Sequence, residues 1–317
     1  MKASRQFLWS LTLAVCGAAV TDSSWAAASR AKNYADGTER SLRVLTLNVQ
    51  EDAGDRLQGV IELIRRSGAD VVGLQESDGS AARIAKALGF RQFRQDEDRS
   101  ILSRFKFGNP APDKNGVQIL LNNGAKIAFF NVHLNYIPYQ PYQLLQIPYG
   151  NAPFIRTETE ALAEAIKARG HDVKAALNDI SAMKDENIPL ILAGDFNEPS
   201  HQDWTEAAAK AGRHPIKVSW PSTKAFADAG LTDAYRKLYP DEMERPGYTW
   251  TNTTAPDDPK DHHDRIDFIF YRGKGLLPRS AYIIGESTAN ADIVIVPYPG
   301  DHRSVAVEFT LAGKTAR

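Results

Sequence analysis

Cysteine is almost absent from this chain of 317 residues. The single cysteine, Cys16, lies in an N-terminal stretch that reads as an export signal, and no cysteine follows it. A framework of disulfide bonds and catalysis by a thiol are therefore both excluded for the rest of the chain. Hydrophobic residues make up 43% of the sequence and charged residues 24%, which is the composition of an ordinary globular protein.

A hydrophobic run long enough to span a membrane is also missing near the N-terminus. Lys2 and Arg5 precede an apolar run over residues 7–20, and small residues follow at 24–28. This pattern predicts a signal peptide in residues 1–28, because a membrane span needs about 20 apolar residues. We expect a flexible mature N-terminus over residues 29–40 and a secreted or periplasmic protein without a stable membrane span. A retained anchor and a lipoprotein modified at Cys16 stay open as alternatives.

The sequence has no long basic run, and its 38 basic residues nearly balance its 39 acidic ones. Proteins that bind nucleic acid by neutralising phosphates usually carry a basic stripe. The charge pattern therefore weighs against tight, non-specific binding of nucleic acid, but it leaves room for a nuclease that holds its substrate briefly.

One apolar stretch, residues 188–197, is bounded by proline and glycine and predicts a strand buried on both faces. Asp195 and Asn197 follow its apolar part, and the two-residue period of a strand turns them to the same side. Their carboxylate and amide could bind water, a metal ion or a phosphate oxygen. A simple strand-ending turn explains them equally well.

The same arrangement recurs along the chain, since other predicted strands also end in groups that bind metal or phosphate. Hard carboxylate and amide oxygens suit Mg²⁺ or Mn²⁺, whereas the lack of thiols and of histidine pairs at helical spacing argues against structural zinc. A histidine beside a carboxylate can accept a proton from water near neutral pH. The residues concerned are Asn48, Glu76, His133, Asp195, Asn197, Asp267, Asp301 and His302.

No internal repeat or linker interrupts the chain, so we expect a single domain over residues 41–313. Two helices, 156–169 and 171–185, are predicted with a break at Gly170, and a further helix over 225–238. Residues 136–153 form a loop rich in tyrosine, proline and glutamine. Most histidines outside the strand ends match no motif, and we expect His262 and His263 to lie in solvent.

Seven short motifs cover nearly the whole chain after residue 40, and they are Leu45–Val49, Gly73–Glu76, Ile101–Arg104, Asn131–Leu134, Gly194–Asn197, Arg265–Ile269 and Gly300–Arg303. Taken in order, they resemble the endonuclease/exonuclease/phosphatase superfamily. The resemblance implies an α/β fold, a four-layer sandwich of two mostly antiparallel sheets packed face to face with helices outside. It also implies cleavage of a phosphate ester with a divalent metal.

The resemblance also implies roles for the metal-binding residues. Glu76 would be the principal metal ligand, with Asn48 and Asp301 close to the ion. Asp195 would orient or activate the attacking water, and Asn197 would bind phosphate.

The two histidines receive roles from the same resemblance. His133 would donate to the phosphate as charge builds up. His302 would be the general base or the electrostatic partner of the phosphate, oriented by Asp267. Asp264 begins an Asp-Arg-Ile triplet that other branches use, so it is the alternative orienting residue.

The motif His133-Leu134 favours the branch with secreted deoxyribonucleases and sphingomyelinases over the exonuclease III-like branch, and it suggests a secreted bacterial-type member. Tyr136, Tyr139 and Tyr142 follow it and could contact a sugar, inositol, nucleoside or lipid head group, or could form a rigid structural loop.

Three functions remain open. The first is a monomeric phosphodiesterase or phosphatase acting on a small or lipid-linked phosphate ester, with a water activated by His302 and Asp195 attacking in line. The second is an extracellular nuclease of the same fold. The third is an inactive binding module.

Overall fold

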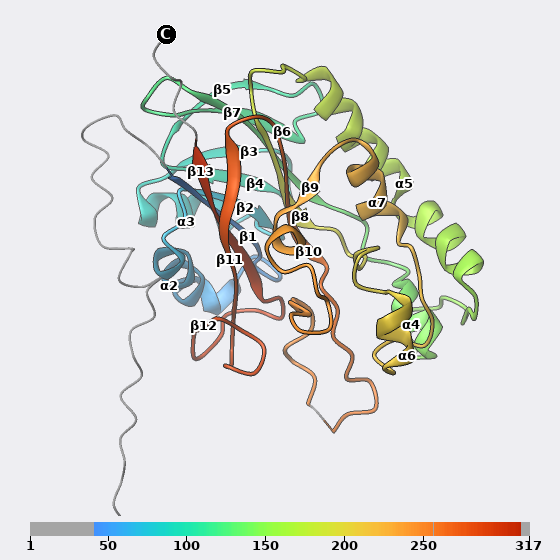
Figure 1. The fold of residues 1–317 in the computed structure, drawn as a ribbon. Helices are drawn as coiled ribbons and strands as arrows, with labels where there is room; N and C mark the ends of the chain where they lie inside the picture. Colours follow the sequence, from blue (N-terminus) through green and yellow to red (C-terminus); the bar gives the residue numbers. More distant parts are fainter. Residues whose placement is uncertain (1–40, 256, 312–317) are drawn as a thin grey trace, which may run out of the picture. The chain divides into compact units, whose positions relative to one another are not determined.

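The computed structural model describes residues 41–255 and 257–311. The predicted signal peptide (1–28) and flexible segment (29–40) lie outside the described residues, as do residues 312–313 of the predicted domain. Figure 1 shows the order of strands and helices in the described ranges. In those ranges no helix is both long enough and apolar enough to cross a membrane.

The strands of the described residues form two sheets, and most neighbouring strands in each are antiparallel. The parallel pairs are β1 with β2, β11 with β12, and β7 with β8. The seven-stranded sheet has the order β12 (Ile293–Val294), β11 (Leu276–Gly285), β13 (Ser304–Leu311), β1 (Ser41–Asn48), β2 (Val71–Gln75), β4 (Ser100–Ser103) and β3 (Arg91–Arg94). The six-stranded sheet has the order β5 (Lys106–Pro110), β6 (Gly116–Leu120), β7 (Lys126–His133), β8 (Leu190–Asp195), β10 (Asp267–Arg272) and β9 (Thr232–Asp233).

A hydrophobic core fills the space between the two sheets, and β1 lies against β8 and β10. Successive side chains of a strand point to opposite faces, so each central strand contributes to two cores. In β7, Ile127 and Phe129 enter the core between the sheets, whereas Ala128 and Phe130 pack on the helix side. Val44 of β1 reaches the inter-sheet core from the other sheet. The two sheets are therefore packed face to face.

Helices cover the outer faces of both sheets, with α2 and α3 beside the seven-stranded sheet and α5 and α7 beside the other (Figure 1). Val173 of α5 and Phe226 of α7 share a core with Phe268 and Phe270 of β10. This arrangement confirms the predicted four-layer α/β sandwich. The helices are α2 (Leu57–Ser67), α3 (Ala81–Leu88), α4 (Gln140–Leu145), α5 (Glu158–Ala182), α6 (Glu206–Lys210), α7 (Pro221–Asp228) and α8 (Ala234–Leu238), with a 3₁₀ turn at Gly54–Arg56.

The predicted break at Gly170 is wrong, because α5 runs through it as one helix. A glycine inside a helix costs only about 1 kcal/mol relative to alanine. The neighbouring Arg169 is fully buried, donates a hydrogen bond to Gln140 and lies 3.8 Å from Glu198. These tertiary contacts hold the helix together across the glycine.

The predicted helix over 225–238 is also wrong, since β9 separates α7 from α8. Gly230 has a φ of 85°, which ends the helical path. Asp233 then accepts hydrogen bonds from the backbone N–H groups of Tyr235 and Arg236 at 2.9 and 3.3 Å. This side chain caps a new helix instead of continuing the old one.

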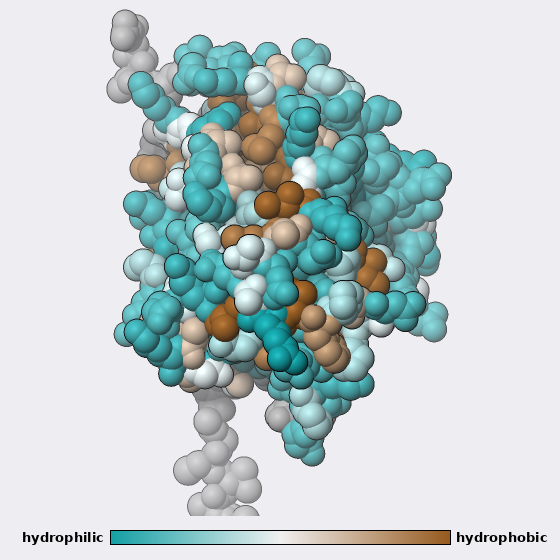
Figure 2. Space-filling view, turned by 90° about the vertical axis from the view of Figure 1, so that its right-hand side faces the viewer, coloured by the Kyte–Doolittle hydropathy of each residue, from teal (hydrophilic) through white to brown (hydrophobic). Residues whose placement is uncertain are grey.

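Hydrophilic residues cover most of the face in Figure 2, with a band of hydrophobic residues through its middle. Large hydrophobic side chains exposed among the described residues come from separate segments, so no single helix or strand presents them together. They are Tyr136, Phe154, Ile166, Leu277 and Val296.

Candidate active site

Three of the predicted site residues lie at the ends of adjacent strands. His133 ends β7, Asp195 ends β8, and Asp267 begins β10. In the strand register, His133 and Asp267 each lie opposite Asp195. Counted in steps of two along its own strand, each of the three shares a face with side chains of the inter-sheet core. They therefore emerge together at one end of that core.

The buried carboxylate of Asp195 is the centre of the site. Its Oδ2 lies 3.6 Å from Nε2 of His133 and 3.7 Å from Nε2 of His302. The same oxygen accepts a hydrogen bond from Nδ2 of Asn48 at 3.1 Å, and Oδ1 accepts one from the backbone N–H of Asn197 at 2.8 Å. One carboxylate thus contacts four other predicted site residues.

His302 is oriented by Asp267, whose Oδ2 lies 3.0 Å from Nδ1 of the ring. Asp264, the alternative partner, is engaged elsewhere. Its two oxygens accept hydrogen bonds from Trp204 Nε1 at 2.8 Å and from the Tyr139 hydroxyl at 2.7 Å. Of the two aspartates, only Asp267 contacts His302.

Both histidines of the site have raised pKa values. Burial opposes the charged form of His302, but the carboxylates of Asp267 and Asp195 outweigh it and hold its pKa well above the ordinary value. Burial also opposes the charge of His133, but its hydrogen bond to the Asp98 carboxylate and the nearby carboxylate of Asp195 raise its pKa. His302 therefore carries a proton at neutral pH in this arrangement.

Asp98 was not predicted from the sequence, yet it positions two site residues. Its Oδ2 lies 2.7 Å from Nδ1 of His133, and its Oδ1 accepts the backbone N–H of Glu76 at 3.1 Å. Asp98 stands in the turn between β3 and β4, and its side chain is 43% exposed. In the sequence this acidic turn looks solvated, and nothing local links it to a histidine 35 positions later.

Glu76, the predicted principal metal ligand, follows β2 with a φ of 54°, a region that non-glycine residues rarely adopt. Its Oε1 accepts a hydrogen bond from Asn48 Nδ2 at 2.9 Å, and its Oε2 accepts one from the backbone N–H of Glu51 at 2.8 Å. Oδ1 of Asn48 accepts the backbone N–H of Gln50 at 2.8 Å, so its amide nitrogen faces the carboxylates. Asn48 thus holds Glu76 and Asp195 together, and a direct bond from Asn48 to a metal stays a prediction.

The residues around Asp301 fit a divalent cation. Among the described residues, the buried Oδ1 of Asp301 has no hydrogen-bond partner. Burial raises the pKa of Asp301, and the carboxylates of Glu76 and Asp195 add to this against the opposing effect of His302. A cation would relieve the repulsion among these carboxylates and satisfy the unpaired oxygen. Such hard oxygen donors suit Mg²⁺ or Mn²⁺.

Asn197 lies beside the centre with a φ of 48°. Its Nδ2 donates a hydrogen bond to the backbone oxygen of Leu134 at 3.1 Å and lies 3.4 Å from Oδ2 of Asp195. The amide hydrogens are therefore directed at protein acceptors, and the predicted contact with phosphate stays a prediction.

An open groove of about 790 Å³ borders His133 and Tyr136. Small-molecule sites in proteins have volumes of about 300–1,000 Å³, so the groove can accept a substrate of that class. Its charged side chains have both signs, and acidic ones predominate. They are Asp96, Asp98, Arg99, Asp113, Asp172 and Lys174.

The tyrosine-rich segment is mostly scaffold. Tyr139 and Tyr142 are buried, at 3% and 8% exposure, in a cluster with Ile266 and Trp250. Tyr136 is 54% exposed and lines the groove. Tyr139 and Tyr142 are therefore structural, as one of the two predictions for this segment had it, and contact with substrate stays a prediction for Tyr136.

The expectation that His262 lies in solvent is wrong. Its side chain is only 10% exposed, and its Nε2 lies 2.9 Å from Asp264 Oδ2. His263 is 24% exposed and pairs with Asp261. The loop before β10 brings His262 against the ring of Trp204, a tertiary contact that the polar sequence of the loop does not reveal.

Comparison with known proteins places this geometry in a family. The model of the Endonuclease/Exonuclease/phosphatase family matches residues 45–302, a segment that contains every predicted site residue. A Caenorhabditis elegans relative, "Uncharacterized protein F14F9.5", is 29% identical over 309 residues, covering 86% of this chain and 92% of that protein.

Solved structures share the fold at low sequence identity. D. rerio TDP2 complexed with single-strand DNA product has a TM-score of 0.53 at 20% identity, covering 85% of this chain and 98% of that one. The human Nocturnin catalytic domain with bound sulfate has a TM-score of 0.52 at 20% identity, with coverages of 86% and 95%. An AP endonuclease from Archaeoglobus fulgidus has a TM-score of 0.54 at 14% identity, with coverages of 84% and 98%. These likenesses concern the fold, and the match over residues 45–302 shows that the chain belongs to the endonuclease/exonuclease/phosphatase family.

Proposed function

We propose that this protein is a phosphoesterase that requires Mg²⁺ or Mn²⁺ and hydrolyses a small or lipid-linked phosphate ester. The position of Asp195 carries the proposal, since its Oδ2 lies 3.6 and 3.7 Å from the Nε2 atoms of His133 and His302. The other ring nitrogen of each histidine faces a second carboxylate, Asp98 or Asp267. Two oriented imidazoles around one carboxylate suit phosphoryl transfer to water, in which positioning and charge stabilisation carry most of the catalysis.

Each residue of the centre has a role that its surroundings support. Asp195 is a buried acceptor and would orient the attacking water and receive its proton as the new bond to phosphorus forms and the ester bond breaks. His302 already carries a proton, so it would stabilise negative charge on the phosphate. His133 would donate to the phosphate as charge builds up in the transition state.

Glu76 and Asp301 would hold the metal ion, with Asn48 fixing Glu76 in place. When bound, the ion would neutralise charge on the phosphate oxygens. The carboxylates of Glu76 and Asp195 stay close enough to Asn48 to accept its amide hydrogens at 2.9 and 3.1 Å. This hydrogen bonding would keep the two carboxylates ready for the ion and the water respectively.

The groove beside His133 supports a small substrate. The carboxylates of Asp96, Asp113 and Asp172 in this groove would repel a long polyanion such as a nucleic acid. Proteins that bind such polyanions attract them with a basic surface instead. We infer from this and from the His133-Leu134 motif a place in the deoxyribonuclease/sphingomyelinase-like branch.

An extracellular nuclease is the second candidate. It is favoured by the likeness in fold to D. rerio TDP2, which was solved with a single-strand DNA product. Short single strands would place only a few phosphates near the acidic groove.

A substrate panel distinguishes the candidates. Purified protein would be incubated with plasmid DNA, RNA, sphingomyelin, phosphoinositides and bis-p-nitrophenyl phosphate, each with and without Mg²⁺. We expect metal-dependent turnover of a lipid or small ester, with DNA and RNA left intact. Cleavage of DNA or RNA alone would establish the nuclease, and no turnover of any of these substrates in Mg²⁺ would favour the inactive binding module.

Export and a monomeric state are part of the same proposal. The expectation of export rests on residues 1–28 of the sequence. Expression of the full chain in a Gram-negative host, followed by periplasmic extraction, mass spectrometry and size-exclusion chromatography, tests both. Recovery only in the cytoplasm with residues 1–28 intact would contradict export.

A further inference from the structure

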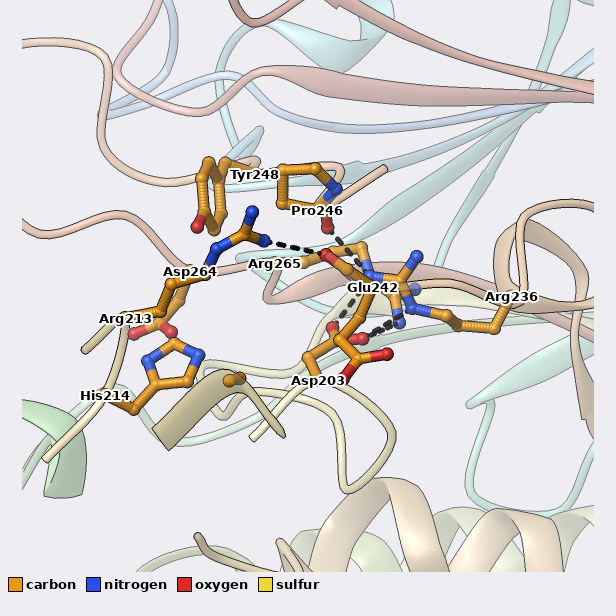
Figure 3. Close-up of a pocket in the computed structure, with 10 residues that line it drawn as sticks. Asp203, Arg213, His214, Arg236, Glu242, Pro246, Tyr248, Asp264 and Arg265 are labelled. Carbon is orange, nitrogen blue, oxygen red and sulfur yellow. Dashed lines mark hydrogen bonds and ion pairs between the residues drawn. The ribbon is translucent and has the colours of Figure 1, made fainter. Parts of the chain in front are cut away.

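A second group of potential metal ligands lies away from the catalytic centre. It consists of His214 between α6 and α7, His262 in the loop before β10, and Asp264 just ahead of β10. One ligand atom from each of the three residues lies within 4.8 Å of the other two. Figure 3 shows the ring of His214 facing the carboxylate of Asp264.

Two imidazole nitrogens in this group lack hydrogen bonds. Nδ1 of His214 is buried and has no partner among the described residues, and the side chain as a whole is only 6% exposed. Nε2 of His262 lies 2.9 Å from Oδ2 of Asp264 but without the alignment of a hydrogen bond. Buried polar atoms are nearly always paired, so the Nδ1 of His214, which has no partner beside this carboxylate, calls for an explanation. Nε2 of His262 is held there only by its ion pair with Asp264.

The surroundings hold these side chains in place. Asp264 accepts hydrogen bonds from Trp204 Nε1 at 2.8 Å and from the Tyr139 hydroxyl at 2.7 Å. The ring of His214 stacks on Trp204, with centroids 4.1 Å apart and an angle of 11° between the planes. Fixed outer contacts of this kind orient the ligands of a metal.

Neighbouring arginines direct their charge elsewhere. Arg265 pairs with Asp203 and Asp233, and Arg236 pairs with Asp203. Arg213 donates to the backbone oxygens of residues 242 and 243. Figure 3 shows these side chains around a small cavity of about 10 Å³, which His214 and Asp264 also line. A space of this size holds about one water molecule.

We propose that His214, His262 and Asp264 bind a divalent transition-metal ion, Zn²⁺ by its ligand chemistry, at a site separate from the catalytic centre. Two imidazoles and one carboxylate suit Zn²⁺, with one water as the fourth ligand, whereas Mg²⁺ prefers oxygen alone. The ligand atoms of a tetrahedral Zn²⁺ lie about 2.0–2.2 Å from the ion, so small side-chain rotations would close the site. The histidines are far apart in sequence, and the absence of histidine pairs at helical spacing does not exclude such a site.

The site would stabilise the segment that carries Asp267, the aspartate that orients His302. Asp264 stands three positions before Asp267, and its backbone forms an isolated bridge with Trp250. The ring of Trp250 in turn lies 6.3 Å from that of His302. An ion bound by Asp264 would therefore hold in place the segment that leads to Asp267 and His302, without touching substrate.

The test uses the full-length protein freed of metal by a chelator and then titrated with Co²⁺, a spectroscopic substitute for Zn²⁺. We expect one equivalent with the visible absorption of four-coordinate Co²⁺, and a rise in melting temperature when Zn²⁺ replaces it. Glu76→Gln should keep both signals, because it weakens only metal binding at the catalytic centre. His214→Ala and, separately, His262→Ala should lose both, and His171→Ala, with a side chain 95% exposed, is the matched control.

The outcomes separate the alternatives. A Co²⁺ spectrum that disappears in Glu76→Gln and persists in His214→Ala would assign the ion to the catalytic centre and overturn the proposal. Absence of any bound Co²⁺ or Zn²⁺ in folded wild-type protein would overturn it too. If His214→Ala does not fold, the loop variant His262→Ala decides the question, and neither readout depends on phosphoesterase activity.

Discussion

The imidazole of His133 is held by Asp98, whose Oδ2 lies 2.7 Å from Nδ1 of the ring. His302 and Asp267 form a similar pair at 3.0 Å on the other side of Asp195. Both histidines therefore present Nε2 to the same carboxylate. The difference is in exposure, since the Asp98 side chain is 43% exposed and that of Asp267 only 1%.

Asp98→Asn should lower kcat by about 10- to 100-fold, by analogy with the loss seen when a carboxylate that orients a metal-binding imidazole is removed. The expected cause is a misplaced His133, so His133→Ala combined with Asp98→Asn should cost much less than the product of the single losses. Initial rates on the active substrate of the panel measure this. Asp78→Asn, which alters another acidic residue at 56% exposure, is the control, and independent losses would remove Asp98 from the site.

Removal of divalent metal should abolish turnover, and Mg²⁺ or Mn²⁺ should restore it, because Glu76 and Asp301 offer only oxygen ligands. Glu76→Gln should raise the Mg²⁺ concentration needed for half-maximal rate while circular dichroism stays unchanged. Titration of EDTA-treated enzyme with each metal gives the measurement. Full activity in excess chelator would reject the metal assignment.

His302 makes the stability of the metal-free protein depend on pH. Its pKa is raised in the folded state, so the protonated ring stabilises the fold most at pH values below its ordinary pKa of about 6.5. This contribution is lost as pH rises through the folded-state pKa. In EDTA, the free energy of unfolding should therefore fall as the pH rises from about 6.5 towards the folded-state pKa of His302. For the variant His302→Gln, the free energy of unfolding should fall less over the same pH range. Parallel curves for the two proteins would show that His302 is not the titrating group.

The strand-end residues were predictable because the two-residue period of a strand is a local property. Asp195 and Asp267 needed only their own strands to be placed on the inward face. Asp98 and His262 could not be placed in this way. Their partners are held by other segments, and the polar turns that carry them resemble any solvated loop.

The errors in helices have the same origin. The local sequence predicts that a helix ends at Gly170, because glycine is a poor helix former. The burial of Arg169 against Glu198 outweighs the cost of the glycine, and the helix continues. Conversely, the apolar pattern over 225–238 suits one helix, but Asp233 caps a new helix and pairs with Arg265 at 2.6 Å. Tertiary contacts decided both cases.

Gly194→Ala should destabilise the protein strongly. An added Cβ would lie 2.2 Å from the backbone oxygen of Val132 in the paired strand β7, where no side-chain rotation can relieve it. We expect a loss of about 3 kcal/mol or more, the upper end for an overpacked site. Gly212→Ala is the control, because its φ of 76° is strained but nothing lies within 4 Å. Urea unfolding curves measure both, and equal losses would show that strain at φ, not the contact with β7, is decisive.

The tyrosine segment yields a prediction with opposite outcomes for two of its residues. Tyr136→Ala should reduce kcat/KM on the natural substrate. If that substrate presents a base to stack on the ring, the loss should correspond to about 1–3 kcal/mol of transition-state stabilisation. The same variant should leave methyl p-nitrophenyl phosphate nearly unchanged, because this minimal diester gives the exposed ring of Tyr136 little to hold. The ratio of the two kcat/KM values is the measurement.

Tyr139→Phe is the matched variant, since it removes only the hydroxyl that donates to Asp264 at 2.7 Å. Loss of a buried hydrogen bond to a charged group costs about 1.5–3 kcal/mol, so the melting temperature should fall. Both substrates should then lose activity equally, because the ring lies at 3% exposure and cannot reach them. Equal losses on both substrates for Tyr136→Ala as well would make Tyr136 part of the same scaffold. The groove beside His133 would then have no side chain from this segment to select a head group.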